Sequence, residues 1–128
     1  MRRPILLAAT LAALACPLTV NAADKVLMYT GNGGNAGYGF TSVEAGVLAA
    51  GATAFDATTT WPGDLSEYRV VFLFLNETAF TQTQIDQIDT FRDDGGLLGL
   101  IVDHTTWYDD SIDVMNGFLT YYGADSYF

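Results

Sequence analysis

One histidine, placed two residues after the end of an apolar run, carries the clearest catalytic chemistry in the sequence. His104 follows residues 97–102 and stands beside Asp103. An imidazole next to a carboxylate can exchange a proton near neutral pH, and a second acid such as Glu77 could act as its partner. His104, Asp103 and Glu77 therefore form the candidate catalytic set of a hydrolase or lyase acting on a sugar derivative.

Polar and aromatic residues also follow two earlier apolar runs, so the same part of the molecule could bind a ligand without catalysis. In an open α/β sheet, ligands bind outside the carboxyl ends of the strands. Amides and acids suit the hydroxyl groups of a sugar, and aromatic faces suit the apolar face of its ring. The competing interpretation is an ordinary polar rim. The candidate ligand-binding residues are Asn32, Asn35, Tyr38, Asn76, Glu77, Asp103, His104, Trp107 and Tyr108.

These side chains depend for their position on a strand–helix–strand unit that we expect between Tyr68 and His104. Residues 70–75 form an unbroken apolar run rich in Val and Phe, which is typical of a strand buried on both faces. Residues 97–102 form a second such run. Two strands joined through a helix are expected to be parallel neighbours in one sheet.

The helix of this unit has clear start and stop signals. Thr81 followed by Gln84 has the spacing of a capping box, in which two side chains bond the free amides of the first turn. An apolar stripe follows at helical spacing, and the Gly-Gly pair at 95–96 ends the helix. The stripe consists of Ile85, Ile88 and Phe91.

The rest of the chain continues the alternation of strands and helices. We expect strands at 25–29 and 52–57, a helix capped by Thr41 and Ser42 that runs to about Ala50, and a helix capped by Ser111. The first of these helices should turn Val43, Val47 and Leu48 inward. The pattern predicts a three-layer α/β/α sandwich with a mainly parallel sheet. Residues 124–128 look like the start of a further strand. We therefore expect a chain truncated at its C-terminus, with a sheet edge and some apolar surface left uncovered.

The first 23 residues have the pattern of a secretory signal peptide. A basic start at 1–3 precedes an apolar run at 5–15, and Val20-Asn21-Ala22 offers a cleavage site. We expect a secreted or periplasmic protein whose domain spans residues 24–128. An uncleaved anchor and a lipoprotein attached through Cys16 are the alternatives. Cys16 is the only cysteine, so the processed chain would contain neither thiol nor disulfide.

The charge and the glycine-rich loop limit the classes of partner. The formal charge of −10 becomes −12 when Arg2 and Arg3 are removed, so we expect no nucleic-acid partner and only transient membrane contact through the leader. Residues 31–36 form a variant of the dinucleotide-binding fingerprint, with Asp56 as the ribose-binding acid. The expected helix begins only at Thr41, several residues too late for this motif. We therefore expect no cofactor. The acids around 103–113 lack the spacing of a known calcium loop, and we expect no metal site.

The order of elements resembles the class I glutamine amidotransferase-like superfamily, which has a flavodoxin-like fold, and is most similar to its trehalose-utilisation-like branches. The matching pieces are residues 25–30 with their glycine loop, residues 68–76 and residues 94–100. In true amidotransferases a Gly-x-Cys-x-Gly elbow follows the last of these pieces. Here Ile101 stands at the place of the cysteine, and Asp103 at the place of the second glycine.

This resemblance implies a scaffold with a ligand cleft but no amidotransferase nucleophile. We therefore expect a non-catalytic domain that binds a small polar ligand such as a carbohydrate, or a module of a cell-envelope protein. The alternative is the sugar-directed enzyme that would use His104 with a nearby carboxylate.

Overall fold

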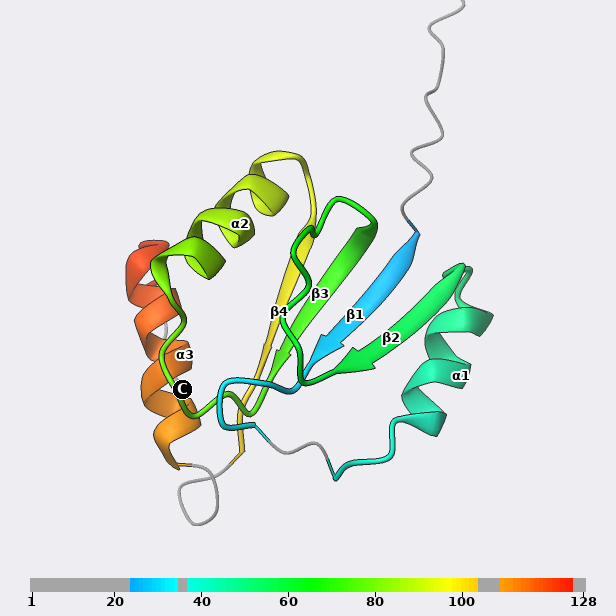
Figure 1. The fold of residues 1–128 in the computed structure, drawn as a ribbon, viewed down its shortest axis with the longest axis horizontal. Helices are drawn as coiled ribbons and strands as arrows, with labels where there is room; N and C mark the ends of the chain where they lie inside the picture. The colour runs from blue at the N-terminus through cyan, green and yellow to red at the C-terminus, as the bar shows by residue number, and fades with distance from the viewer. Residues whose placement is uncertain (1–23, 35–36, 104–108, 126–128) are drawn as a thin grey trace, which may run out of the picture.

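The structure is a computed structural model that describes residues 24–34, 37–103 and 109–125. Strands and helices alternate along the described chain (Figure 1). The elements are β1 (Lys25–Tyr29), α1 (Thr41–Ala49), β2 (Ala54–Thr58), β3 (Tyr68–Phe74), α2 (Gln82–Asp93), β4 (Leu97–Ile101) and α3 (Asp109–Tyr121).

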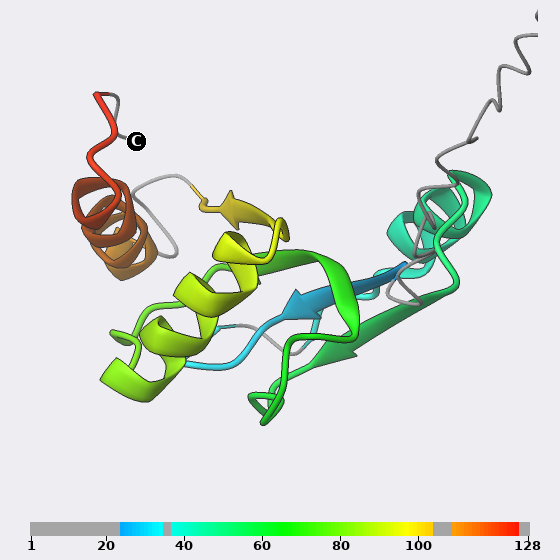
Figure 2. The same ribbon diagram turned by 90° about the horizontal axis from the view of Figure 1, so that it is seen from above.

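The four strands form one parallel sheet in the order β2-β1-β3-β4. In register, Leu27 of β1 lies opposite Asp56 of β2 and Val71 of β3, and Val71 lies opposite Leu98 of β4. Figure 2 shows α1 on one face of the sheet and α2 with α3 on the other. The arrangement confirms the expected α/β sandwich and is consistent with a flavodoxin-like fold.

Most of the core lies between the sheet and the pair α2 and α3. Leu27 and Leu73 are fully buried and pack in one cluster with Ile88 of α2 and Met115 of α3. Strand side chains alternate between faces, so the inward residues of β1, β3 and β4 all contribute to this side. The other buried members of the cluster are Tyr29, Leu65, Val71, Phe80, Phe91 and Phe118.

The helix α2 has the ends that its sequence predicts. The Thr81 side chain accepts a hydrogen bond from the Gln84 amide, and the Gln84 side chain accepts one from the Thr81 amide, which completes the capping box. At the other end Gly95 has a φ of +89°, a conformation that favours glycine. Gly96 is required for a different reason, because an added Cβ would overlap the Phe91 ring.

The helix α1 differs from its prediction. It follows Phe40, and no side chain caps its first turn, so the predicted caps at Thr41 and Ser42 are wrong. Val43 and Leu48 are each 41% exposed rather than inward, and Val47 is only half-buried. The reason is its position, since α1 lies beside the edge strand β2, where little sheet surface is available to cover it (Figure 1).

The α1 side of β3 and β4 is apolar and thinly covered. Phe72 and Phe74 are only half-buried on this side, and Leu97 is 58% exposed. Gly99 gives room to the Phe72 ring, which an added Cβ would overlap. Within the described ranges, α1 is the only helix on this side, although parallel sheets are usually covered on both faces (Figure 2).

A tyrosine pair fastens α3 to α2. The hydroxyl groups of Tyr121 and Tyr122 donate to the two carboxylate oxygens of Asp89 at 2.7 and 2.8 Å. The Arg92 guanidinium lies 3.8 Å from the centre of the Tyr122 ring, a cation–π contact. Burial, helped by the hydrogen bond to Asp89, raises the pKa of Tyr122 to about 12. None of the helices in the described part of the chain is long and apolar enough to cross a membrane.

The raised tyrosine pKa values predict a loss of stability at high pH. Burial and the hydrogen bond to Asp56 also raise the pKa of Tyr68 to about 12, against about 10 in an unfolded chain. Above pH 10 the unfolded state therefore releases protons that the folded state keeps. We expect the free energy of unfolding, measured by urea denaturation, to stay level up to about pH 10 and to fall between pH 10 and 12. The fall should be smaller in the double variant Tyr68→Phe/Tyr122→Phe, and an equal fall in that variant would contradict this explanation.

Candidate functional site

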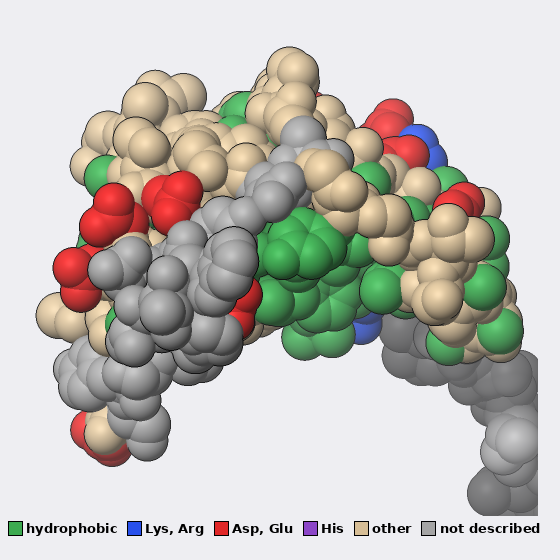
Figure 3. All heavy atoms as spheres, turned by 90° about the horizontal axis from the view of Figure 1, so that it is seen from below, with side chains coloured by type: hydrophobic (Ala, Val, Ile, Leu, Met, Phe, Trp, Pro, Cys, Tyr) green, Lys and Arg blue, Asp and Glu red, His purple; other side chains and the backbone are tan. Residues whose placement is uncertain are grey.

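The residues that follow β1 and β3 meet at the carboxyl edge of the sheet, where β4 also ends. Figure 3 views the molecule from this end and shows hydrophobic side chains gathered at the surface beside α1, with acidic side chains toward the α2 and α3 side. The chain leaves β1 toward α1 on one face and β3 toward α2 on the other, so the strands β1 and β3 flank the topological switch point (Figure 2).

A glycine turn after β1 connects the loop that follows β1 to the loop that follows β3. The Gly34 amide donates to the Gly31 carbonyl at 3.0 Å, and Asn32 and Gly33 between them have φ values of 50° and 82°. The Asn32 carbonyl accepts hydrogen bonds from the amides of Glu77 and Thr78 at 2.9 and 2.8 Å. The crevice at the switch point is therefore bridged by the protein's own backbone.

The Asn32 side chain serves this turn rather than an open cleft. Its Oδ1 accepts from the Tyr29 hydroxyl at 2.6 Å and from Gln84 Nε2 at 3.3 Å. Its Nδ2 donates to the carbonyls of Thr78 and Ala79, each at 3.3 Å. These contacts use both ends of the amide, so Asn32 holds the β3 loop and the start of α2 against β1.

Asn76 is the second predicted binding residue that faces inward. It is fully buried, and its Nδ2 donates to the Gly31 carbonyl at 2.7 Å. Its Oδ1 is also buried and has no hydrogen-bond partner among the described residues. Leu75, immediately before it, is a buried residue with a φ of +50°, and its amide donates to the Ile101 carbonyl. The strained turn at 75–76 thus places the amide of Asn76 beneath the glycine turn.

Tyr38 and Glu77 are the predicted residues that offer free groups at the surface. Tyr38 is 46% exposed, and its ring stands edge-on to Phe74 with the ring centres 5.4 Å apart. Phe40 contacts the same Phe74 ring at 5.2 Å. The half-buried Glu77 lies against Gly33, and no described residue pairs with its carboxylate.

The remaining predicted residues divide into one that is placed and four that are not. Asp103 is half-buried, two residues beyond the end of β4, and makes a polar interaction. Of the candidate catalytic set, only Asp103 and Glu77 can therefore be placed. Asn35, His104, Trp107 and Tyr108 lie outside the described residues. Ile101, the last residue of β4, stands on the α1 side of the sheet.

The sequence did not predict that Phe40 and Phe74 would pack with Tyr38 at this edge of the sheet. Phe74 was assigned to the buried interior because residues 70–75 form one apolar run, and Phe40 was given no role. The period-2 alternation of strands was the available signal, since it separates Phe72 and Phe74 from Val71 and Leu73.

The glycine loop does not have the geometry of a dinucleotide site. The helix α1 begins only at Thr41, and the glycine turn lies against the protein itself, because an added Cβ at Gly31 would overlap the Tyr29 phenol. Asp56 accepts a hydrogen bond from the Tyr68 hydroxyl at 3.0 Å. Across residues 24–34, 37–103 and 109–125, no three His, Cys, Asp or Glu side chains gather as they would around a metal ion.

Comparisons with known proteins identify no relative: no family model, no curated protein and no solved structure matches the chain.

The bonds of Asn32 predict a large loss of stability when its side chain is removed. Asn32→Ala deletes the partner of the buried Tyr29 hydroxyl and places alanine at a positive φ, so we expect it to lower the free energy of unfolding by about 2–3 kcal/mol. Asn32→Gly removes the same bonds but accepts the positive φ, and it should cost about 1 kcal/mol less. Urea denaturation of both variants measures the difference. Equal losses would mean that the backbone conformation contributes nothing.

Proposed function

We propose that this chain is an exported, non-catalytic domain of the class I glutamine amidotransferase-like superfamily that binds a small polar ligand, a carbohydrate, at the carboxyl end of its sheet. In the cell it serves as a binding module of the envelope or the medium. The leader at residues 1–23 supports export. The parallel sheet with order β2-β1-β3-β4 is the scaffold that such a domain requires.

The observation that carries the binding proposal is the half-exposed ring of Tyr38. It contacts Phe74 in a T-shaped arrangement and is 46% exposed, so part of the Tyr38 ring is accessible to a sugar. Glu77 follows Phe74 by three residues, and its carboxylate, which has no partner among the described residues, can accept hydrogen bonds from sugar hydroxyl groups. An exposed aromatic ring and an acid at the same edge of the sheet suit a polyhydroxylated ligand.

The absence of a nucleophile at the end of β4 supports a binding function rather than amide transfer. Ile101 has an aliphatic side chain that can neither attack a carbonyl carbon nor exchange a proton. The tied loops around Asn32 also favour a preformed surface, because a ligand does not have to order them on binding.

A panel of monosaccharides and short oligosaccharides, titrated by calorimetry or by amide chemical shifts, tests the binding proposal. The variant Tyr38→Ala loses a stacking contact that contributes about 1 kcal/mol, so it should bind the best sugar several-fold more weakly. Tyr38→Phe keeps the ring and should keep most of the affinity. Glu77→Gln should weaken it as well, through loss of a charged acceptor. Tyr121→Ala, which removes another exposed tyrosine on α3, is the control and should leave affinity unchanged. Absence of binding across the panel, or unchanged affinity in Tyr38→Ala, would refute the proposal.

Export makes a separate prediction. When the full chain is expressed in a bacterium with an outer membrane, mass spectrometry of the periplasmic fraction should find a protein that begins at Ala23 or Asp24. A protein retained in the membrane and carrying lipid on Cys16 would establish the lipoprotein alternative instead. An unprocessed chain in the cytoplasm would contradict both.

A further inference from the structure

A groove of about 570 Å³ lies on the α2 side of the molecule, away from the α1 side on which Tyr38 packs. It runs between α2 and the connection from β2 to β3. That connection, residues 59–67, contains no helix, although a crossover between parallel strands usually does. Trp61 and Leu65 cover the sheet in place of a helix, which leaves the side of α2 open.

The groove has the length and lining of a site for a chain-like ligand. Thr83 and Asp94 mark its ends along α2, and eleven helical steps correspond to about 17 Å. Its volume falls within the range of small-molecule sites, about 300–1,000 Å³. Tyr68 supplies half-buried aromatic surface, whereas Leu65 and Phe91 are only 4% and 5% exposed, and hydroxyl, amide and carboxylate groups surround them.

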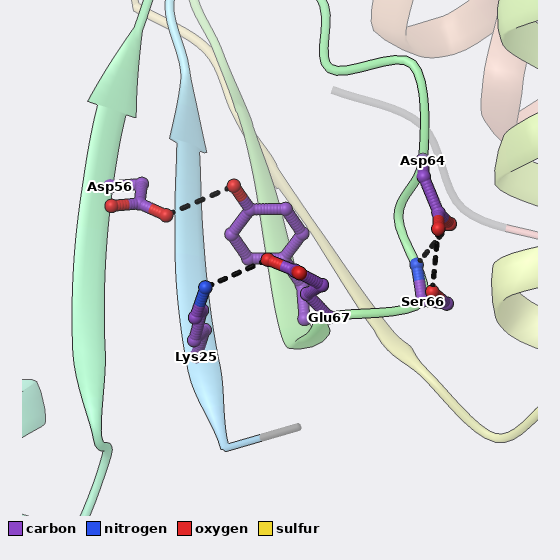
Figure 4. Close-up of polar contacts among 6 residues, drawn as sticks. Lys25, Asp56, Asp64, Ser66 and Glu67 are labelled. Carbon is purple, nitrogen blue, oxygen red and sulfur yellow. Dashed lines mark hydrogen bonds and ion pairs between the residues drawn. The ribbon is translucent and has the colours of Figure 1, made fainter. Parts of the chain in front are cut away.

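The walls are held in place by hydrogen bonds. Trp61 Nε1 donates to Gln87 Oε1 at 2.6 Å, and Gln87 Nε2 donates to the Gly63 carbonyl at 2.7 Å, so the connection is fastened to α2. Asp64 accepts from the amide and the hydroxyl of Ser66, both at 2.8 Å. Figure 4 shows this turn, and also the Lys25–Glu67 ion pair that fastens the end of the connection to β1. A ligand would therefore find the site already ordered.

Two charged groups in the lining of the groove match sugar hydroxyl groups. Arg69 and Asp94 both line the groove, and neither side chain has a hydrogen-bond or ion-pair partner within the described residues. The guanidinium only donates hydrogen bonds, and the carboxylate only accepts them. A sugar hydroxyl does both, so hydroxyl groups along a sugar chain can accept from Arg69 and donate to Asp94.

We propose that this groove binds a short linear oligosaccharide of uncharged sugars, at a site separate from the one at the carboxyl end. The half-buried Tyr68 ring receives a sugar ring face, and the polar walls receive the hydroxyl groups. Three aspartates line the groove against one arginine, so a chain of acidic sugars is repelled. The proposal rests on the groove alone and does not require the proposed function of the carboxyl end.

The test titrates the processed full chain with neutral oligosaccharides of one to six units, from glucose, mannose and xylose series, and follows calorimetric heat and amide shifts. We expect affinity for the groove to rise with chain length over the first few units, with amide shifts at residues 63–69 and 83–96 that are separate from any shifts at the carboxyl end. Asp94→Asn and Arg69→Gln should each weaken binding about tenfold. Asp93→Asn, which removes a neighbouring exposed acid outside the groove, and Tyr38→Ala should leave it unchanged.

Several results would overturn the proposal. These are no binding by any of the three series, equal losses in Asp93→Asn and Asp94→Asn, or uronic acid oligomers that bind as tightly as neutral ones. Loss of oligosaccharide binding in Tyr38→Ala, with unchanged binding in Asp94→Asn, would assign the ligand to the carboxyl end and exclude the groove.

Discussion

The packing of α2 and α3 against one face of the sheet is the interaction on which the rest of the molecule depends. Leu27 and Leu73 from the central strands meet Ile88 and Met115 from the helices, and all four side chains are fully buried. This layer places β1 and β3 side by side and so brings their loops within reach of each other. The Asn32 carbonyl then joins the loops through the amides of Glu77 and Thr78. The rigid carboxyl edge is thus a consequence of the core beneath it.

The strand–helix–strand unit could be predicted from sequence because its local signals agree. The apolar run indicates β3, the capping box at Thr81 indicates where α2 begins, and the glycine at 95 indicates where α2 ends. These three signals are consistent with one another. For α1 the signals disagreed with the outcome. Thr41 and Ser42 are good cap residues by type, but the chain enters the helix through Phe40, and Val43 and Leu48 find no partner surface beside an edge strand. Tertiary position decided against local propensity there.

The candidate site could be predicted in place but only partly in role. The rule that ligands gather at the carboxyl ends of strands selected loops that the structure brings together, where Tyr38 is exposed and Glu77 has no partner among the described residues. Residue type could not show that Asn32 and Asn76 direct their amides into the protein, because that depends on positive φ values at Asn32 and Leu75. The groove beside α2 was also missed. It exists because the 59–67 connection contains no helix, and no sequence motif marks it.

The thinly covered apolar stripe on the α1 side of β3 and β4 makes the surface of the molecule uneven: one apolar region lies on a protein that is otherwise strongly charged. This stripe, which includes Phe72 and Leu97, favours contact with the same stripe on another molecule. The formal charge of −10 has the opposite effect, because it makes whole molecules repel one another. The range of that repulsion is set by dissolved ions and shrinks to about 10 Å at 0.1 M salt. Salt therefore changes the balance of these two forces without any change in the fold.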